Sequence, residues 1–165
     1  MPFGIDGNIQ VLGLNELRSK FKLLGIHVSD KTLFETIGQY LTSAIKMRTL
    51  DGKDIEGQPF IDYSPRYEFF RQEKGLPTTP DLFFTGSMLN SMTYKTDVAE
   101  ESVTVFFGPG TSKGSTVQNS AKAFFNQQTR PFFGMSAANI EKVTSIYREH
   151  VWKTLRKRTG QRRRF

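Results

Sequence analysis

Apolar side chains recur at helical spacing in two long stretches of the chain. From residue 30 to about residue 48 they fall three and four positions apart, which predicts an amphipathic helix. Its stripe consists of Leu33, Phe34, Ile37, Leu41, Ala44 and Ile45. Ser29 and Asp30 stand where a helix N-cap is needed. Gly38 lies inside the stripe at some cost in helix stability, and we interpret it as a point of close packing.

The second stripe predicts the last helix of the chain, with Ser136 as its N-cap. It consists of Ile140, Val143, Tyr147, Val151 and Leu155. A shorter helix is expected over 121–128. Near the start of the chain, a short strand is expected over 9–11 and a helix over 13–24 that stops at Gly25. The apolar positions of that helix are Leu14, Leu17, Phe21 and Leu24.

A β-hairpin is predicted between these helices. The segments 92–97 and 102–107 are rich in β-branched and aromatic residues and flank a polar turn. The segment 108–120, rich in glycine, serine and threonine, is by composition the most flexible part, and long loops of this kind are often functional. Taken in order, the elements predict an α+β domain. It has a small antiparallel sheet with a long hairpin, packed against two or three amphipathic helices.

The stretch 57–92 is a series of turns and caps. Ser64 can cap a short helix, and Pro65 suits its first position because no N–H is needed there. Gly75 can close that helix in the left-handed conformation. Thr85 and Gly86 then break the chain before a second short apolar turn.

The residues of this stretch carry a resemblance. Gly-Gln-Pro-Phe at 57–60 and Tyr-Ser-Pro-Arg-Tyr at 63–67 are followed by Asp-Leu-Xaa-Xaa-Thr-Gly-Xaa-Met-Leu-Xaa-Ser at 81–91. Together they resemble the virion-morphogenesis family of tailed bacteriophages, also called tail-completion or neck proteins. Arg-Pro-Phe-Phe-Gly-Met-Ser at 130–136 is similar to a second signature of that family. The family's usual histidine–glutamine pair and helical aspartate are replaced here by Asn126-Gln127 and Asn139.

The resemblance extends over roughly residues 9–158 and implies a structural role. It implies a neck component of the virion, made in the bacterial cytoplasm, that assembles as a ring at the head–tail junction. The implied partners are copies of itself and other neck and tail proteins (stopper, terminator or tube), with DNA in the channel as a further candidate. From the residues themselves we expect no enzymatic activity, no cofactor and no membrane. The alternative is an accessory protein that binds DNA without sequence preference.

Aromatic residues provide candidate subunit contacts. Fifteen phenylalanines include five doublets, at 69–70, 83–84, 106–107, 124–125 and 132–133. In a strand, neighbouring side chains point to opposite faces, so one ring of a doublet needs a second layer or a neighbouring subunit. Guided by the resemblance, we expect contacts from Tyr63, Tyr67, Phe83, Phe106, Phe107, Phe132 and Phe133. Burial of each within its own core is the alternative.

The net charge of +7 is concentrated at one end of the chain. The segment 148–165 carries eight basic side chains and one acidic side chain, so the rest of the chain is neutral. We divide the chain into a domain over 1–158 and a basic tail over 159–165. Residues expected to contact DNA or an acidic partner are Arg156, Lys157, Arg158, Arg162, Arg163 and Arg164.

Catalytic and metal-binding patterns are weak in this sequence. The chain has no cysteine, which excludes disulfides and thiolate sites, and its two histidines share no ligand spacing. The acids of segment 51–62 do not match an EF-hand, and Gly114 is not followed by the lysine of a P-loop. Acids near Tyr63 and Arg66 are more typical of plain ion pairs than of acid–base catalysis. No apolar run spans a bilayer and no signal peptide is recognised, so we expect a soluble protein.

Overall fold

The computed structural model describes residues 30–161, and the side chains of residues 30–157. The strand predicted over 9–11, the helix predicted over 13–24 and the candidate cap Ser29 lie outside the described residues. The described part contains helices α2 to α6 and one two-stranded antiparallel sheet. It is the α+β architecture expected from the order of elements.

Helix α2 (Lys31–Leu50) forms the centre of the core. The Asp30 carboxylate caps it by accepting the Leu33 N–H at 2.8 Å. The predicted stripe is buried, except that Ala44 is half-buried, and Thr49 extends it by one more turn. Burial of this face against other elements stabilises the helix more than intrinsic propensity does.

The hairpin consists of strands β1 (Met92–Asp97) and β2 (Ser102–Phe107), paired with Met92 opposite Phe107 and Asp97 opposite Ser102. One face packs on α2 and carries the buried side chains Met92, Val103 and Val105. Tyr94, on the same face, lies directly over Gly38 of α2, where a Cβ atom would collide with the tyrosine ring. The interpretation of Gly38 as a point of close packing is confirmed.

The shorter helices are α3 (Pro65–Glu73), α4 (Ser87–Asn90) and α5 (Asn119–Thr129). Ser64 accepts the Tyr67 N–H at the start of α3, with Pro65 in the first turn. Gly75 follows the end of α3 with φ of 66°. Its N–H and that of Leu76 bond back to carbonyls of the last turn, so the predicted stop is confirmed.

Helix α6 (Ala137–Gln161) is capped reciprocally by Ser136 and Asn139. Asn139 also accepts a hydrogen bond from Arg48 of α2 at 2.8 Å and donates one to the Tyr40 hydroxyl. The Arg48 guanidinium also donates to the carbonyls of Phe132 and Gly134 at 2.8 Å each. Burial lowers the pKa of Arg48, and nearby Asp54 partly offsets this. The hydrogen bonds that Arg48 donates therefore fix the loop before α6 to α2.

One residue of the predicted α6 stripe is misplaced. Ile140 is 50% exposed, whereas Val143, Tyr147 and Val151 are buried. The inward position of the first turn is occupied by Asn139, because its side chain is needed for the cap and for Arg48. The inward face therefore begins one residue earlier than the apolar pattern predicted.

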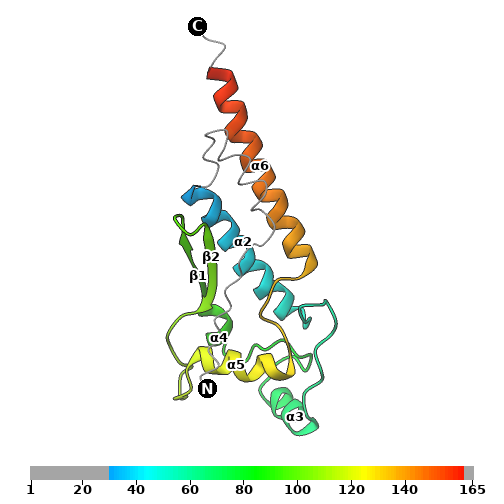
Figure 1. The fold of residues 1–165 in the computed structure, drawn as a ribbon. Helices are drawn as coiled ribbons and strands as arrows, with labels where there is room; N and C mark the ends of the chain where they lie inside the picture. The colour runs from blue at the N-terminus through cyan, green and yellow to red at the C-terminus, as the bar shows by residue number, and fades with distance from the viewer. Residues whose placement is uncertain (1–29, 162–165) are drawn as a thin grey trace.

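The elements are arranged around α2. Figure 1 shows the hairpin on one side of α2 and α6 on the other, with α3, α4 and α5 gathered at one end. The C-terminal part of α6 extends beyond the N-terminal end of α2 (Figure 1). This helix continues through Gln161, past the boundary drawn at residue 158 between the domain and the basic tail.

Candidate functional site

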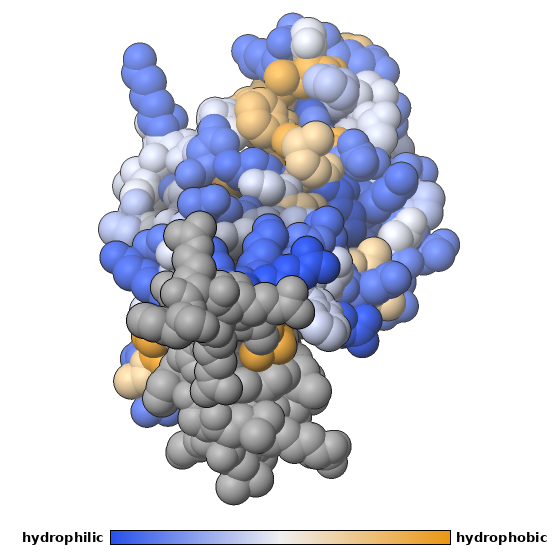
Figure 2. All heavy atoms as spheres, turned by 90° about the horizontal axis from the view of Figure 1, so that it is seen from above, coloured by the Kyte–Doolittle hydropathy of each residue, from blue (hydrophilic) through white to orange (hydrophobic). Residues whose placement is uncertain are grey.

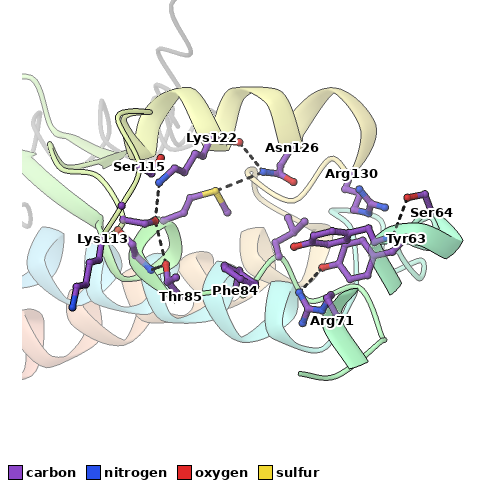
Figure 3. Close-up of a pocket in the computed structure, with 17 residues that line it drawn as sticks. Tyr63, Ser64, Arg71, Phe84, Thr85, Lys113, Ser115, Lys122, Asn126 and Arg130 are labelled. Carbon is purple, nitrogen blue, oxygen red and sulfur yellow. Dashed lines mark hydrogen bonds between the residues drawn. The ribbon is translucent and has the colours of Figure 1, made fainter. Parts of the chain in front are cut away.

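A cleft of about 620 Å³ opens where α3, the segment 82–88, the loop 112–115 and α5 meet (Figure 3). This volume is typical of ligand pockets in proteins. Among the described residues that line the cleft there is no carboxylate, whereas four carry a positive charge. These four are Arg71, Lys113, Lys122 and Arg130.

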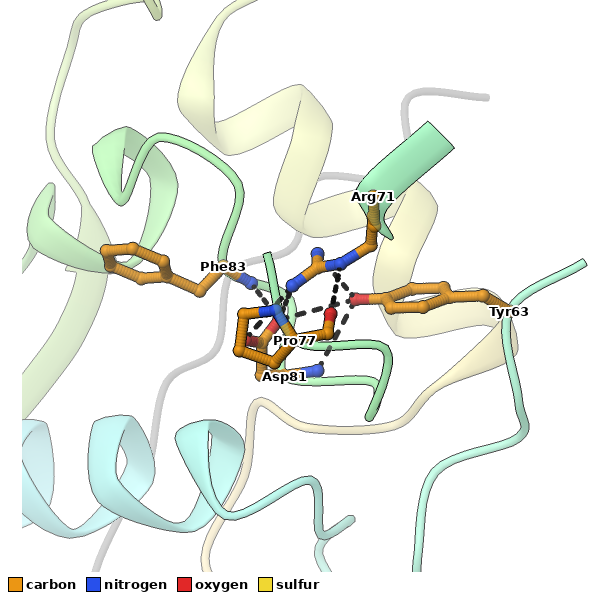
Figure 4. A network of polar contacts seen from close by, with 5 residues as sticks. All are labelled: Tyr63, Arg71, Pro77, Asp81 and Phe83. Atoms are coloured by element: carbon orange, nitrogen blue, oxygen red, sulfur yellow. Dashed lines mark hydrogen bonds and ion pairs between the residues drawn. The ribbon is translucent and has the colours of Figure 1, made fainter. Parts of the chain in front are cut away.

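The inner end of the cleft is fixed by a buried ion pair (Figure 4). Arg71 is 1% exposed and donates to both carboxylate oxygens of Asp81, at 2.9 and 3.2 Å. Its other nitrogens donate to the Pro77 carbonyl at 2.6 Å and the Tyr63 hydroxyl at 3.2 Å. Asp81 also accepts the Phe83 N–H at 2.9 Å. The network ties α3 to the segment that leads into α4.

The Tyr63 hydroxyl is part of this network and is half-buried. Loss of solvation raises the pKa of Tyr63 above its usual value of 10.0, and the charge of Arg71 partly opposes the shift. Tyr63 is therefore a neutral phenol at physiological pH. It accepts from Arg71 and from the Asp81 backbone N–H, at 3.2 and 3.3 Å.

The other cations of the cleft have no carboxylate partner among the described residues. Arg130 donates from Nε and one terminal nitrogen to the carbonyls of Ile61 and Asp62, at 2.8 and 2.9 Å. Lys122 donates to the Ser112 hydroxyl at 2.7 Å. Lys113 is exposed at the opposite end of the cleft from Arg130 (Figure 3). Once Arg71 is neutralised by Asp81, the described lining of the cleft carries three positive charges without a carboxylate partner.

Aromatic rings form one wall of the cleft. The ring of Tyr63 meets that of Tyr67 edge-on with centroids 4.9 Å apart, and Tyr67 stacks on Phe70 at 6.1 Å. Phe70 in turn stacks on Phe84 at 6.0 Å. Aromatic pairs in such arrangements stabilise a surface beyond the area that they bury. Tyr63, Tyr67 and Phe84 of this row line the cleft and give it an apolar side, and Arg71 and Arg130 pack on the Tyr63 ring.

The expected contact residues fall in different environments. Tyr63 and Tyr67 line the cleft, and Phe106 is exposed on the outer face of the hairpin. Phe83 and Phe107 are half-buried against the core. The structure therefore brings Tyr63 and Tyr67 together but separates them from Phe106.

The expectation for Phe132 and Phe133 needs correction. Their side chains are 0% and 9% exposed, and Phe107 packs on both with ring centroids 6.0 and 5.0 Å apart. They lie in the loop before α6, which Arg48 and Gln127 hold in place through its backbone. A doublet in a loop can turn both rings inward, because the alternation of strand faces does not apply there.

Other rings on the surface do not belong to the expected contact residues. Phe69 on α3, Phe125 on α5 and Trp152 on α6 are each more than 60% exposed. On α3 and α5 the exposed ring belongs to a doublet. Adjacent residues on a helix point about 100° apart, so the two rings of a doublet face different directions. Figure 2 shows hydrophobic residues reaching the surface between hydrophilic ones on the face that it draws.

The expected basic contact residues lie at the end of α6. Arg156 and Lys157 are exposed, and the backbone of Arg158 is helical. Arg162, Arg163 and Arg164 lie outside the described residues. Trp152 is exposed on the same stretch of helix.

The acids near Tyr63 and Arg66 in the sequence are Asp62, Glu68 and Asp81, and none of them forms an ion pair with Arg66. Asp81 pairs with Arg71 instead, and Arg66 points outward as an exposed side chain. Within residues 30–157, no group of three potential metal ligands comes together. The described helices include none that is long and apolar enough to cross a bilayer.

Comparisons with known protein families, with curated proteins and with solved structures found no match for this chain.

Proposed function

We propose that the protein is a structural subunit that assembles with copies of itself, as a ring in the neck of a tailed bacteriophage. The observation that carries the proposal is the exposure of large aromatic side chains on three separate helices. Exposed aromatic groups of this kind favour protein–protein interfaces over open solvent. The phage context comes from the resemblance of segments 57–67, 81–91 and 130–136.

The positions of the exposed rings suit a ring of subunits. A cyclic assembly uses head-to-tail contacts, so each subunit needs two different surfaces. Helix α3, which carries Phe69, lies at one end of the molecule (Figure 1). The C-terminal part of α6, which carries Trp152, extends at the other end. The head–tail junction of a virion, with stopper, terminator or tube proteins as neighbours, is the proposed location.

The test is the mass of the full-length protein in solution, measured by light scattering at physiological and at high salt. The proposal predicts a discrete oligomer at both salt concentrations, because contacts between apolar rings are not screened by ions. Replacing Phe69 or Trp152 with glutamine should reduce the mass while leaving the unfolding temperature within a few degrees. Lys142→Gln, an exposed change on α6, is the matched control. A wild-type protein that stays monomeric at all concentrations would refute the proposal.

A second candidate function is DNA binding without sequence preference by the end of α6. It is favoured by the helical placement of Lys153, Arg156 and Lys157 beside the exposed Trp152. Basic side chains that neutralise phosphates give an affinity that falls steeply with salt. Titration with double-stranded DNA at two salt concentrations tests it, and replacement of Lys153 and Lys157 with alanine should weaken binding. The two functions are compatible, because DNA passes through the channel of a neck ring.

A further inference from the structure

The cleft between α3 and α5 faces the base of the hairpin. Its lining includes Gly86, Ser87 and Met88, which lead through α4 into β1, and residues 112–115, which follow β2. Each strand has six residues, and an antiparallel strand rises about 3.4 Å per residue. The hairpin turn therefore lies about 20 Å from the base of the strands. Figure 1 shows it at the end of the hairpin away from α3, α4 and α5, whose region forms the cleft. A chain cannot place its own turn in its own cleft.

The hairpin turn and the cleft have complementary charges. The turn carries three acids within five residues, Asp97, Glu100 and Glu101, around the exposed Val98. Asp97 shapes the turn by accepting the N–H groups of Ala99 and Glu100 at 2.9 and 3.0 Å. The cleft carries the cations Lys113, Lys122 and Arg130 and an apolar aromatic wall. An acidic turn with the exposed apolar side chain of Val98 fits this chemistry.

We propose that the hairpin turn of one subunit docks in the cleft of the next subunit. The inference rests on the proposed function and adds a second contact between its subunits, beside the exposed rings of α3 and α6. Because turn and cleft are different surfaces at opposite ends of the hairpin, the contact is head-to-tail and forms a ring when its rotation closes. The carboxylate of Glu100 pairs with the cations of the cleft, and Val98 packs on the aromatic wall.

The aromatic wall itself favours a protein segment over single-stranded nucleic acid. Binding of single strands uses exposed ring faces on which bases stack. The faces of Tyr63 are covered by the guanidinium groups of Arg71 and Arg130, whose centres lie 4.9 and 5.0 Å from the ring centroid (Figure 3). Tyr67 and Phe84 each stack on Phe70. A base therefore finds no free face on Tyr63, and the cleft suits a protein segment better.

Charge reversal in full-length protein tests the contact. Lys113→Glu changes the cleft and Glu100→Lys changes the turn; both side chains are exposed and form no hydrogen bond or ion pair with a described side chain. Each single reversal should raise the subunit concentration at half-assembly about tenfold or more, since close interfacial charge pairs couple strongly. The double variant, with both charges exchanged, should return to within about threefold of wild type. Glu141→Lys and Lys142→Glu, on exposed positions of α6, are controls that should leave assembly unchanged.

Crosslinking gives an independent readout, because the natural chain has no cysteine. A chain with Glu100→Cys and Lys113→Cys should form a covalent ladder between subunits under oxidation, whereas Glu141→Cys with Lys113→Cys should not. If wild type assembles but neither reversal weakens it and no ladder forms, the docking contact is wrong and the proposed function stands. If only Lys113→Glu weakens assembly, the cleft holds another segment, and the assignment of the hairpin turn as its occupant is refuted. If wild type is monomeric, the proposed function fails as well.

Discussion

Removal of the Arg71 side chain tests whether the buried ion pair organises the cleft. In Arg71→Met, an apolar side chain of similar length replaces the guanidinium, and Asp81 is left without its cation. The loss includes two bonds to the Asp81 carboxylate and one each to Pro77 and Tyr63. Breaking a buried pair by removing one partner costs about 3–5 kcal/mol, mainly because a charge stays buried and unpaired.

The expected loss is large for a domain of this size. Native domains are stable by about 5–15 kcal/mol, so Arg71→Met removes a substantial fraction of the free energy of unfolding. At about 2–4 °C per kcal/mol, the unfolding temperature should fall by about 6–20 °C. Urea unfolding followed by far-UV circular dichroism measures the change in the free energy of unfolding. Arg66→Met, an exposed arginine on the same helix, is the matched control and should change stability by less than about 0.5 kcal/mol.

A second variant separates the unpaired charge from lost packing. Asp81→Asn added to Arg71→Met removes the buried charge and keeps an oxygen that accepts the Phe83 N–H. The double variant should therefore be more stable than Arg71→Met alone, by about 1 kcal/mol or more. A loss below about 1 kcal/mol in Arg71→Met, or a double variant no more stable than the single one, would overturn this explanation of the ion pair.

Three further predictions concern other parts of the described fold. Gly38→Ala should lower the free energy of unfolding by about 1–3 kcal/mol in urea titrations, because its Cβ meets the Tyr94 ring, and no loss would contradict the packing. Asn139→Ala should cost about 1–2 kcal/mol by the same measurement, since it removes the reciprocal cap with Ser136 and an acceptor of Arg48. Lys142→Ala, at an exposed position of the same helix, is its control and should change stability by less than about 0.5 kcal/mol. The raised pKa of Tyr63 means that the folded state holds this proton longer than the unfolded state, so stability should fall as pH rises above about 10. Tyr63→Phe should reduce that fall in unfolding experiments between about pH 9 and 11, and an unchanged slope would count against the shift.

Local signals in the sequence were sufficient for most elements. The stripe of α2, the caps Asp30, Ser64 and Ser136, and the stop at Gly75 each depend on contacts within a few residues. The hairpin was equally local, with two β-rich segments around a short turn. Such features are readable because the side chain and the backbone group that it satisfies are neighbours in the chain.

The contacts that build the cleft could not be predicted in the same way. Arg66 and Arg71 both lie on α3, and which of them meets Asp81 depends on how the turn after Gly75 returns the chain. The signal that could have found Arg71 is its position one helical turn after Tyr67, on the face shared with that ring. Burial of Phe132 and Phe133 depends on Arg48, which donates to the Phe132 carbonyl although it lies 84 positions earlier in the chain.

The decisive measurement is the mass of the wild-type protein in solution, with that of Lys113→Glu beside it. Light scattering should give one discrete oligomer for wild type, retained at high salt, and a shift toward smaller species for Lys113→Glu at the same subunit concentration. A wild-type monomer at every concentration would contradict the proposed role as an assembly subunit. An oligomer that Lys113→Glu leaves intact would contradict the assignment of the cleft as its contact.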